Sequence, residues 1–301
     1  MAKPRRVIPG ATYMITRRTE HRVFRLKPDP LTNQIALYCL AWAASRHGIL
    51  VYAIVLLSDH IHVVLKDANG LLPKFMMDFH RNMAKALNAA QGQCENLWSN
   101  EHAHAVLVPT LDDLVEEVAY IVSNPVRAEL VADPSQWPGV LCWEPGGRIA
   151  IKRPDVYFSA EGAAPDRVEL RLAVPDGVDE REWEDRLRQA IAKRVAEARR
   201  TVQGQGRKFA GAARVQATSI LARAMNRAGM RKCKPVVNTL DPLMRHRCLA
   251  VQRHFERSYA ASLSRWKAGD RTVVFPHGTW WMRVHHGAWT GPPTTADALY
   301  P

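Results

Sequence analysis

The spacing of apolar residues along the first half of the chain predicts a series of strands and helices. Apolar residues alternate with polar ones, or run continuously over a few positions, in residues 11–18, 49–57, 61–66 and 103–108, which predicts strands. Apolar residues recur every three or four positions in residues 31–47, 71–90 and 110–124, which predicts helices. The resulting order of elements predicts an α+β fold, a ferredoxin-like split βαβ antiparallel sheet with one added helix.

A change in composition predicts where this domain ends, because Gly, Pro and Ala become frequent after Gly146. The expected division is a first domain over residues 1–145, a linker over 146–165 and a C-terminal region over 166–301. The elements expected in the C-terminal region are helices over 180–200 and 241–267, a glycine-rich basic loop over 204–211 and a hairpin over 272–285. That region is therefore expected to be basic and mostly helical.

The formal charge of +13 is unevenly distributed along the chain. Residues 1–150 hold 15 Lys and Arg against 14 Asp and Glu, whereas residues 151–301 hold 27 against 15, so the net charges are +1 and +12. A basic excess of this kind indicates a nucleic-acid partner, although an acidic membrane surface would attract the same charge. No lipid-binding helix, secretory signal or membrane-length apolar run is visible, so we expect a cytoplasmic protein associated with the nucleoid.

Two histidines stand one residue apart in the third expected strand, where residues 58–65 read SDHIHVVL. Side chains at positions i and i+2 of a strand share a face, so His60 and His62 would point together while Ile61 and Val63 point into a core. Such a pair can bind a metal ion, because imidazole is a common metal ligand. The alternative is that both are half-exposed surface residues.

A tyrosine and an asparagine share one face of the third expected helix. Tyr120 and Asn124 are four residues apart, which places them one helical turn from each other. Two imidazoles and an amide oxygen could hold a divalent cation that polarises a phosphodiester, and the phenol could then be the nucleophile. Taken singly, Tyr120 could be an ordinary helix residue and Asn124 a helix terminator before Pro125.

These motifs resemble those of a known family. His60-Ile61-His62 matches the HUH motif, and Tyr120-x-x-x-Asn124-Pro125-Val126-x-Ala128 resembles the tyrosine helix of the REP-associated tyrosine transposases, which are relatives of the single-tyrosine insertion-sequence transposases. Residues 10–18 (GATYMITRR) and the pair Leu97-Trp98 are also similar to that family. The resemblance covers about the first 145 residues.

The resemblance implies a fold, an activity and a set of site residues. His60, His62 and Asn124 would bind Mg²⁺ or Mn²⁺, and Tyr120 would attack single-stranded or hairpin DNA at imperfect palindromes, leaving a 5′-phosphotyrosine and a free 3′-hydroxyl. The basic residues expected at the DNA are Arg17, Arg18, Arg127, Arg207 and Lys208. Since the proposed ligands and nucleophile precede residue 125, residues 1–150 alone are expected to retain residual cleavage. A homodimer is left open.

The sequence departs from the family in two places and leaves two rival hypotheses. Ser58-Asp59 stands where Pro-Asn is commoner, which adds a carboxylate near the metal, and Met14 stands where a histidine often follows the strand tyrosine. One rival is a non-catalytic, domesticated protein that binds hairpin DNA. The other is a zinc hydrolase that uses the histidine pair with His102 or His104.

Overall fold

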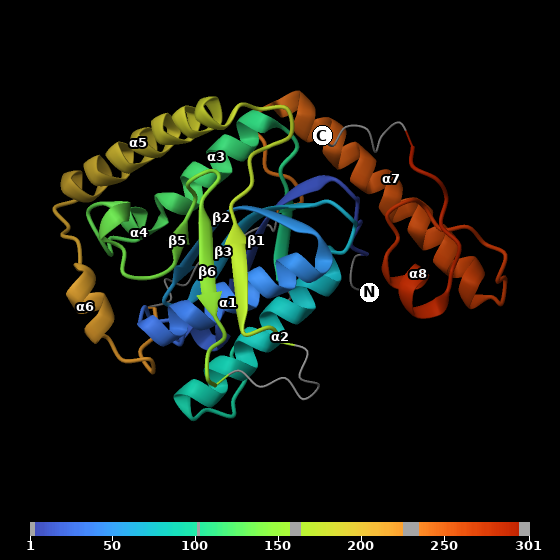
Figure 1. Cartoon of the computed structure of the whole chain (residues 1–301). Helices are drawn as coiled ribbons and strands as arrows, with labels where there is room; N and C mark the ends of the chain where they lie inside the picture. The colour runs from blue at the N-terminus through green and yellow to red at the C-terminus, as the bar shows by residue number, and fades with distance from the viewer. Residues whose placement is uncertain (1–3, 101–102, 157–163, 225–234, 295–301) are drawn as a thin grey trace.

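A five-stranded sheet forms the centre of the protein (Figure 1). The computed structural model describes residues 4–100, 103–156, 164–224 and 235–294. The strand order is β4-β1-β3-β2-β5, and all neighbouring strands are antiparallel. The strands are β1 (Ala11–Arg18), β2 (Ile49–Leu57), β3 (His60–Asp67), β4 (His104–Leu107) and β5 (Leu141–Cys142). The predicted α+β fold with an antiparallel sheet is confirmed.

Two helices, α1 (Pro30–His47) and α2 (Leu72–Gln91), cover one face of this sheet. The side chain of Asp29 accepts a hydrogen bond from a first-turn backbone N–H and so begins α1. Gly48 and Gly92 end the two helices with φ angles of 64° and 60°, in the left-handed region that glycine adopts without a steric penalty. Apolar side chains of both helices pack against the sheet and form the first core cluster.

The other face is covered by α3 (Leu111–Val122), α4 (Asn124–Arg127) and α5 (Glu180–Gly204), and α3 and α5 lie above the sheet in Figure 1. Thr110 caps α3 by accepting a hydrogen bond from the backbone N–H one turn later. The α3 helix ends close to Pro125, which has no N–H to continue the hydrogen bonding. A second core cluster fills the space between these helices and the sheet.

The segment predicted to be a linker takes part in the packed structure. Strands β6 (Arg148–Lys152) and β7 (Arg167–Arg171) form a two-stranded sheet, and β6 lies within residues 146–165. Ile151 and Leu170 are buried in the same core cluster as α1 and α2. The core of the first domain therefore continues beyond residue 145 and, through α5, into the C-terminal half.

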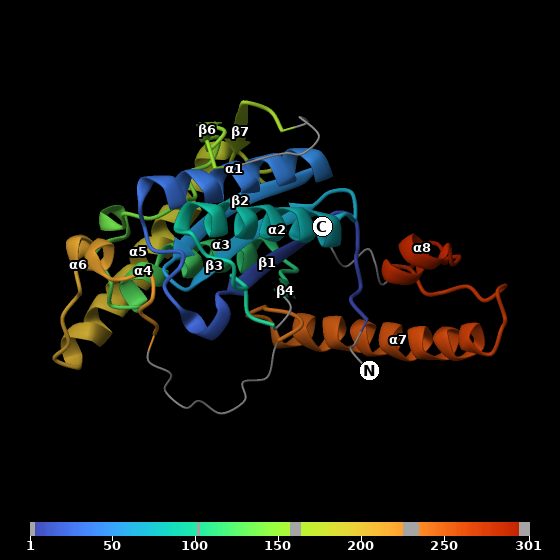
Figure 2. The same ribbon diagram turned by 90° about the horizontal axis from the view of Figure 1, so that it is seen from below.

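The remaining elements are α6 (Ala212–Ala217), α7 (Pro242–Lys267), α8 (Trp281–His286) and the 3₁₀ turns Glu20–Arg22 and Pro134–Gln136. Helices α7 and α8 extend to one side of the sheet (Figure 2), and they share a small core that contains Phe275 and Met282. The predicted helices over 180–200 and 241–267 are confirmed by α5 and α7. In the described part of the chain, no helix is long and apolar enough to cross a membrane.

The hairpin predicted over residues 272–285 is wrong, since that segment ends in α8. Its tryptophans and valines are typical of a strand, but Met282 is buried in the small core as part of the short helix α8. Gly287 ends α8 with a φ of 63°. Phe275 forms an isolated β-bridge to Thr290. This bridge is parallel, whereas the two strands of a hairpin are antiparallel.

Candidate active site

The two histidines of β3 share the face of the sheet that α3 and α5 cover. His62 pairs across the sheet with Thr16 of β1 and Val55 of β2, and Val55 belongs to the second core cluster. Ile61 and Val63 belong to the first cluster, on the opposite face, as the alternation predicts. The rings of His60 and His62 are perpendicular, with centroids 4.9 Å apart. The two imidazoles therefore lie side by side on one face of the sheet.

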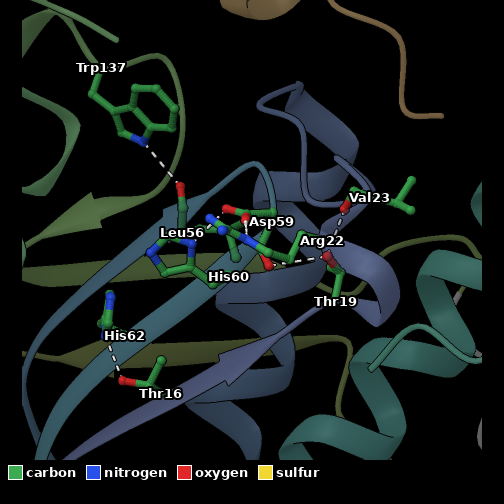
Figure 3. Close-up of polar contacts among 9 residues, drawn as sticks. All are labelled: Thr16, Thr19, Arg22, Val23, Leu56, Asp59, His60, His62 and Trp137. Carbon is green, nitrogen blue, oxygen red and sulfur yellow. Dashed lines mark hydrogen bonds and ion pairs between the residues drawn. The ribbon is translucent and has the colours of Figure 1, made fainter. Parts of the chain in front are cut away.

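His60 is oriented by the carboxylate that precedes it (Figure 3). Its Nδ1 lies 2.6 Å from Oδ1 of Asp59, whose Oδ2 accepts a hydrogen bond of 2.9 Å from Nε of Arg22. Burial alone would raise the pKa of Asp59, but the hydrogen bonds and charges of His60 and Arg22 outweigh it and lower that pKa. A carboxylate on Nδ1 leaves Nε2 of His60 available to a ligand, which is how metal-binding histidines are commonly held.

A strained turn brings Arg22 to this carboxylate. His21 and Arg22 have φ angles of 49° and 57°, in the left-handed region that costs a non-glycine residue roughly 1–2 kcal/mol. The hydroxyl of Thr19 donates to the backbone oxygen of Val23 at 2.7 Å and lies 3.1 Å from that of Asp59 (Figure 3). Thr19 therefore holds the two ends of the turn together and attaches the turn to the residue that precedes β3. Strain of this kind tends to collect at functional sites.

His62 is buried, with 6% of its surface exposed. Its Nδ1 lies 2.8 Å from Oγ1 of Thr16 (Figure 3), so Nε2 of His62, like that of His60, is available to bind a ligand. Burial, followed by the charges of His60 and Arg18, lowers the pKa of His62 well below its usual value. A neutral imidazole is the form that binds metals.

Tyr120 projects from α3 toward this pair. Its ring centroid lies 6.0 Å from that of His62, nearly perpendicular to it, and its side chain is partly exposed. Two guanidinium groups lie over the tyrosine ring, with Cζ of Arg127 at 4.5 Å and Cζ of Arg194 at 6.0 Å from its centroid. Arg127 was predicted at the DNA, whereas Arg194 of α5 was missed because nothing in the sequence shows where α5 packs.

Asn124 begins α4, one helical turn beyond Tyr120, and is buried with 9% of its surface exposed. Its side-chain amide makes no hydrogen bond to another described residue. His104 lies on the same face as His62 but across β1, since both pair with Thr16. His102 lies outside the described residues, and the described ones contain no cluster of three or more His, Cys, Asp or Glu that could hold a metal. Asn124 is the residue whose amide oxygen could add a third ligand to the two imidazoles.

The five predicted DNA-contacting residues fall into different environments. Arg18 pairs with His60 across the sheet and is exposed on the same face as the histidines. Arg17 faces the other way, donating to the backbone oxygen of Ser99 at 3.2 Å, because neighbours on a strand alternate. Arg127 and Lys208 are exposed. The remaining one, Arg207, forms an ion pair with Glu129.

Comparisons with known proteins found no matching protein-family profile and no matching curated protein. One similar solved structure is a REP-associated tyrosine transposase bound to a REP hairpin, with 21% identity and a TM-score of 0.39, over 46% of this chain and 81% of that one. Another is a provisionally assigned transposase from Deinococcus radiodurans R1, with 20% identity and a TM-score of 0.30, over 40% of this chain and 95% of that one. At these scores we base the function on the site geometry alone.

Proposed function

We propose that the protein is a metal-dependent HUH-type single-tyrosine transposase, which nicks single-stranded or hairpin DNA at imperfect palindromes and transfers the cut strand. The observation that carries the proposal is the convergence of His60, His62 and Tyr120 on one face of the sheet, with neighbouring rings 4.9 Å and 6.0 Å apart. The antiparallel order β4-β1-β3-β2, with α1 and α2 on one face, supports the ferredoxin-like arrangement of such a nuclease domain.

The residues present fit a divalent cation such as Mg²⁺ or Mn²⁺. Asp59 and Thr16 engage the Nδ1 atoms of His60 and His62, which leaves both Nε2 atoms for a metal. Asn124 would add an amide oxygen, and a mixed nitrogen and oxygen set with open positions suits an ion that must also bind a phosphate. When bound, the ion would polarise the scissile phosphodiester as a Lewis acid.

The nucleophile in this proposal is the phenolic oxygen of Tyr120. It loses its proton and forms a bond to phosphorus, while the bond from phosphorus to the 3′ oxygen breaks and that oxygen takes up a proton. The products are a 5′-phosphotyrosine and a 3′-hydroxyl. Because one phosphodiester replaces another, attack by a 3′-hydroxyl rejoins the strand without ATP, which suits strand transfer.

Exposed cations beside the site and on α7 would hold the DNA backbone. Arg18 and Arg127 are exposed beside the histidines and the tyrosine, where they can contact phosphates near the cleavage point. Farther away, α7 carries a set of exposed arginines, namely Arg245, Arg247, Arg253 and Arg257. The hairpin would therefore span from the sheet toward α7.

The test of this proposal is nicking of a labelled DNA hairpin with Mg²⁺ or Mn²⁺. His60→Ala and His62→Ala are each expected to lower the rate by at least about 100-fold, because each removes a metal ligand. His104→Ala, on the same face but across β1, is the matched control and should stay within about threefold of the unmodified protein. A loss in His104→Ala equal to those in the other two variants would make His104 a further metal ligand, as the zinc-hydrolase hypothesis requires, and hairpin binding without any nicking would favour the domesticated binding protein.

A second prediction concerns the carboxylate behind His60. Asp59→Asn is expected to lower Mn²⁺ affinity about 10- to 100-fold, since the neutral amide orients the imidazole less firmly and makes it less basic. Asp78→Asn is the matched control, because Asp78 is equally buried and also bridges a histidine and an arginine, but between α1 and α2. Calorimetric Mn²⁺ titration gives the affinities. Unchanged affinity in Asp59→Asn would remove Asp59 from the site.

A further inference from the structure

The C-terminal half reaches the nucleophile through α5. This helix is docked by a stripe of buried residues at helical spacing, Trp183, Leu187, Ile191, Val195, Ala198 and Val202. The docked helix also forms ion pairs with α3. Arg186 pairs with Asp112 at 2.5 Å, and Arg194 pairs with Glu116 at 2.6 Å. The position of α5 on α3 is therefore fixed by both apolar and charged contacts.

Arg194 contacts two consecutive turns of α3. Both its Nε and one Nη donate to the same carboxylate oxygen of Glu116, at 3.0 Å and 2.6 Å. Its Cζ lies 6.0 Å from the ring centroid of Tyr120, four residues further along the same helix face. Both members of the ion pair are only about 30% exposed, at 28% and 31%. Glu116 therefore holds the guanidinium of Arg194 over the ring of Tyr120.

We propose that Arg194 is a positioning residue for Tyr120 and that Glu116 anchors it there. The guanidinium is attracted to the ring face and, with Arg127 over the same ring, restricts where the phenolic oxygen can lie. The basic second half then contributes to the active site itself, and not only to DNA affinity. The kinetic part of this inference rests on the proposed function, because it assumes that Tyr120 is the nucleophile.

The experiment compares Arg194→Ala with Arg186→Ala, which also removes an ion pair between α5 and α3 but one that does not contact Tyr120. Single-turnover adduct formation is measured at saturating hairpin, together with hairpin affinity at several salt concentrations. The ¹³Cζ resonance of Tyr120, assigned with Tyr120→Phe, is recorded in the DNA-free protein. Glu116→Gln is the second variant, since it releases Arg194 without removing its charge.

Arg194→Ala is expected to slow adduct formation about tenfold with unchanged affinity and salt dependence, and to shift the Tyr120 resonance. Glu116→Gln should act in the same direction, and should add nothing to Arg194→Ala in the double variant. Arg186→Ala should change neither rate nor resonance. If the wild-type protein forms no adduct, the proposed function fails, while the resonance still tests the positioning.

Three results would overturn the inference. In the first, the Tyr120 resonance is the same in Arg194→Ala as in the wild type. In the second, Arg194→Ala weakens hairpin binding and lowers the salt slope by roughly 0.7, with the single-turnover rate unchanged, which would make Arg194 a phosphate contact. Equal loss of rate in Arg186→Ala would likewise reduce α5 to a structural role.

Discussion

Tyr120→Phe is expected to reduce the covalent protein–DNA adduct to background, a loss of roughly 10⁴-fold or more, while hairpin affinity and thermal stability stay unchanged. The substitution removes only the phenolic oxygen, which makes no hydrogen bond to another described residue. The ring keeps its contacts with His62 and Arg127. The measurement is denaturing electrophoresis of the protein after incubation with labelled hairpin DNA and Mg²⁺.

The control for this variant is Tyr259→Phe. Tyr259 is partly buried and packs against Phe255 and Phe275 in the small core of α7 and α8, away from the sheet. It should form the adduct at the wild-type rate. An adduct that persists in Tyr120→Phe would move the nucleophile to another residue.

Truncation after residue 150 is expected to give a chain that does not fold stably, and therefore no cleavage at any protein concentration. The residual activity predicted from the positions of the ligands alone does not take account of α5, whose buried Trp183, Leu187, Ile191 and Val195 complete the core against α3. Burying four such side chains contributes about 6–12 kcal/mol, which is comparable to the whole stability of a typical domain. Circular dichroism and thermal unfolding of the fragment measure the effect.

A chain ending at residue 224 is the matched control. It keeps α5 and α6 and loses α7 and α8, which have a small core of their own. This fragment should fold and retain nicking, but bind the hairpin more weakly and with a lower salt slope, because it lacks the exposed arginines of α7. A fragment of residues 1–150 that folds and cleaves would show that α5 is dispensable.

The elements of the first half could be predicted because their signals are local. Apolar periodicity specifies each strand or helix within a few residues. Thr110 marks the start of α3, and the glycines after α1 and α2 mark the ends of those helices. The shared face of His60 and His62 follows from alternation in the same way. By contrast, the strand-like composition of residues 272–285 predicted a hairpin, because the burial of Met282 depends on α7.

The parts of the site that could not be predicted depend on long-range packing. The basic excess of residues 151–301 indicated a nucleic-acid partner, yet Arg186, Arg194 and Arg199 of α5 pair with acidic residues of the first half. The carboxylate of Asp59 was expected near the metal, and in the structure it lies 2.6 Å from Nδ1 of His60 and forms an ion pair with Arg22. The partners of these arginines and the pairing of Asp59 with Arg22 are not visible in the sequence, because each depends on the packing of segments that lie far apart in the chain.

The most direct test of the central claim is mass spectrometry of the protease-digested adduct formed with a hairpin that carries distinguishable labels on either side of the cleavage point. The account predicts that the peptide containing Tyr120 retains the label on the 5′-phosphate side, and that the released strand ends in a 3′-hydroxyl. A label from the other side, a different modified residue, or cleavage without any adduct would contradict it.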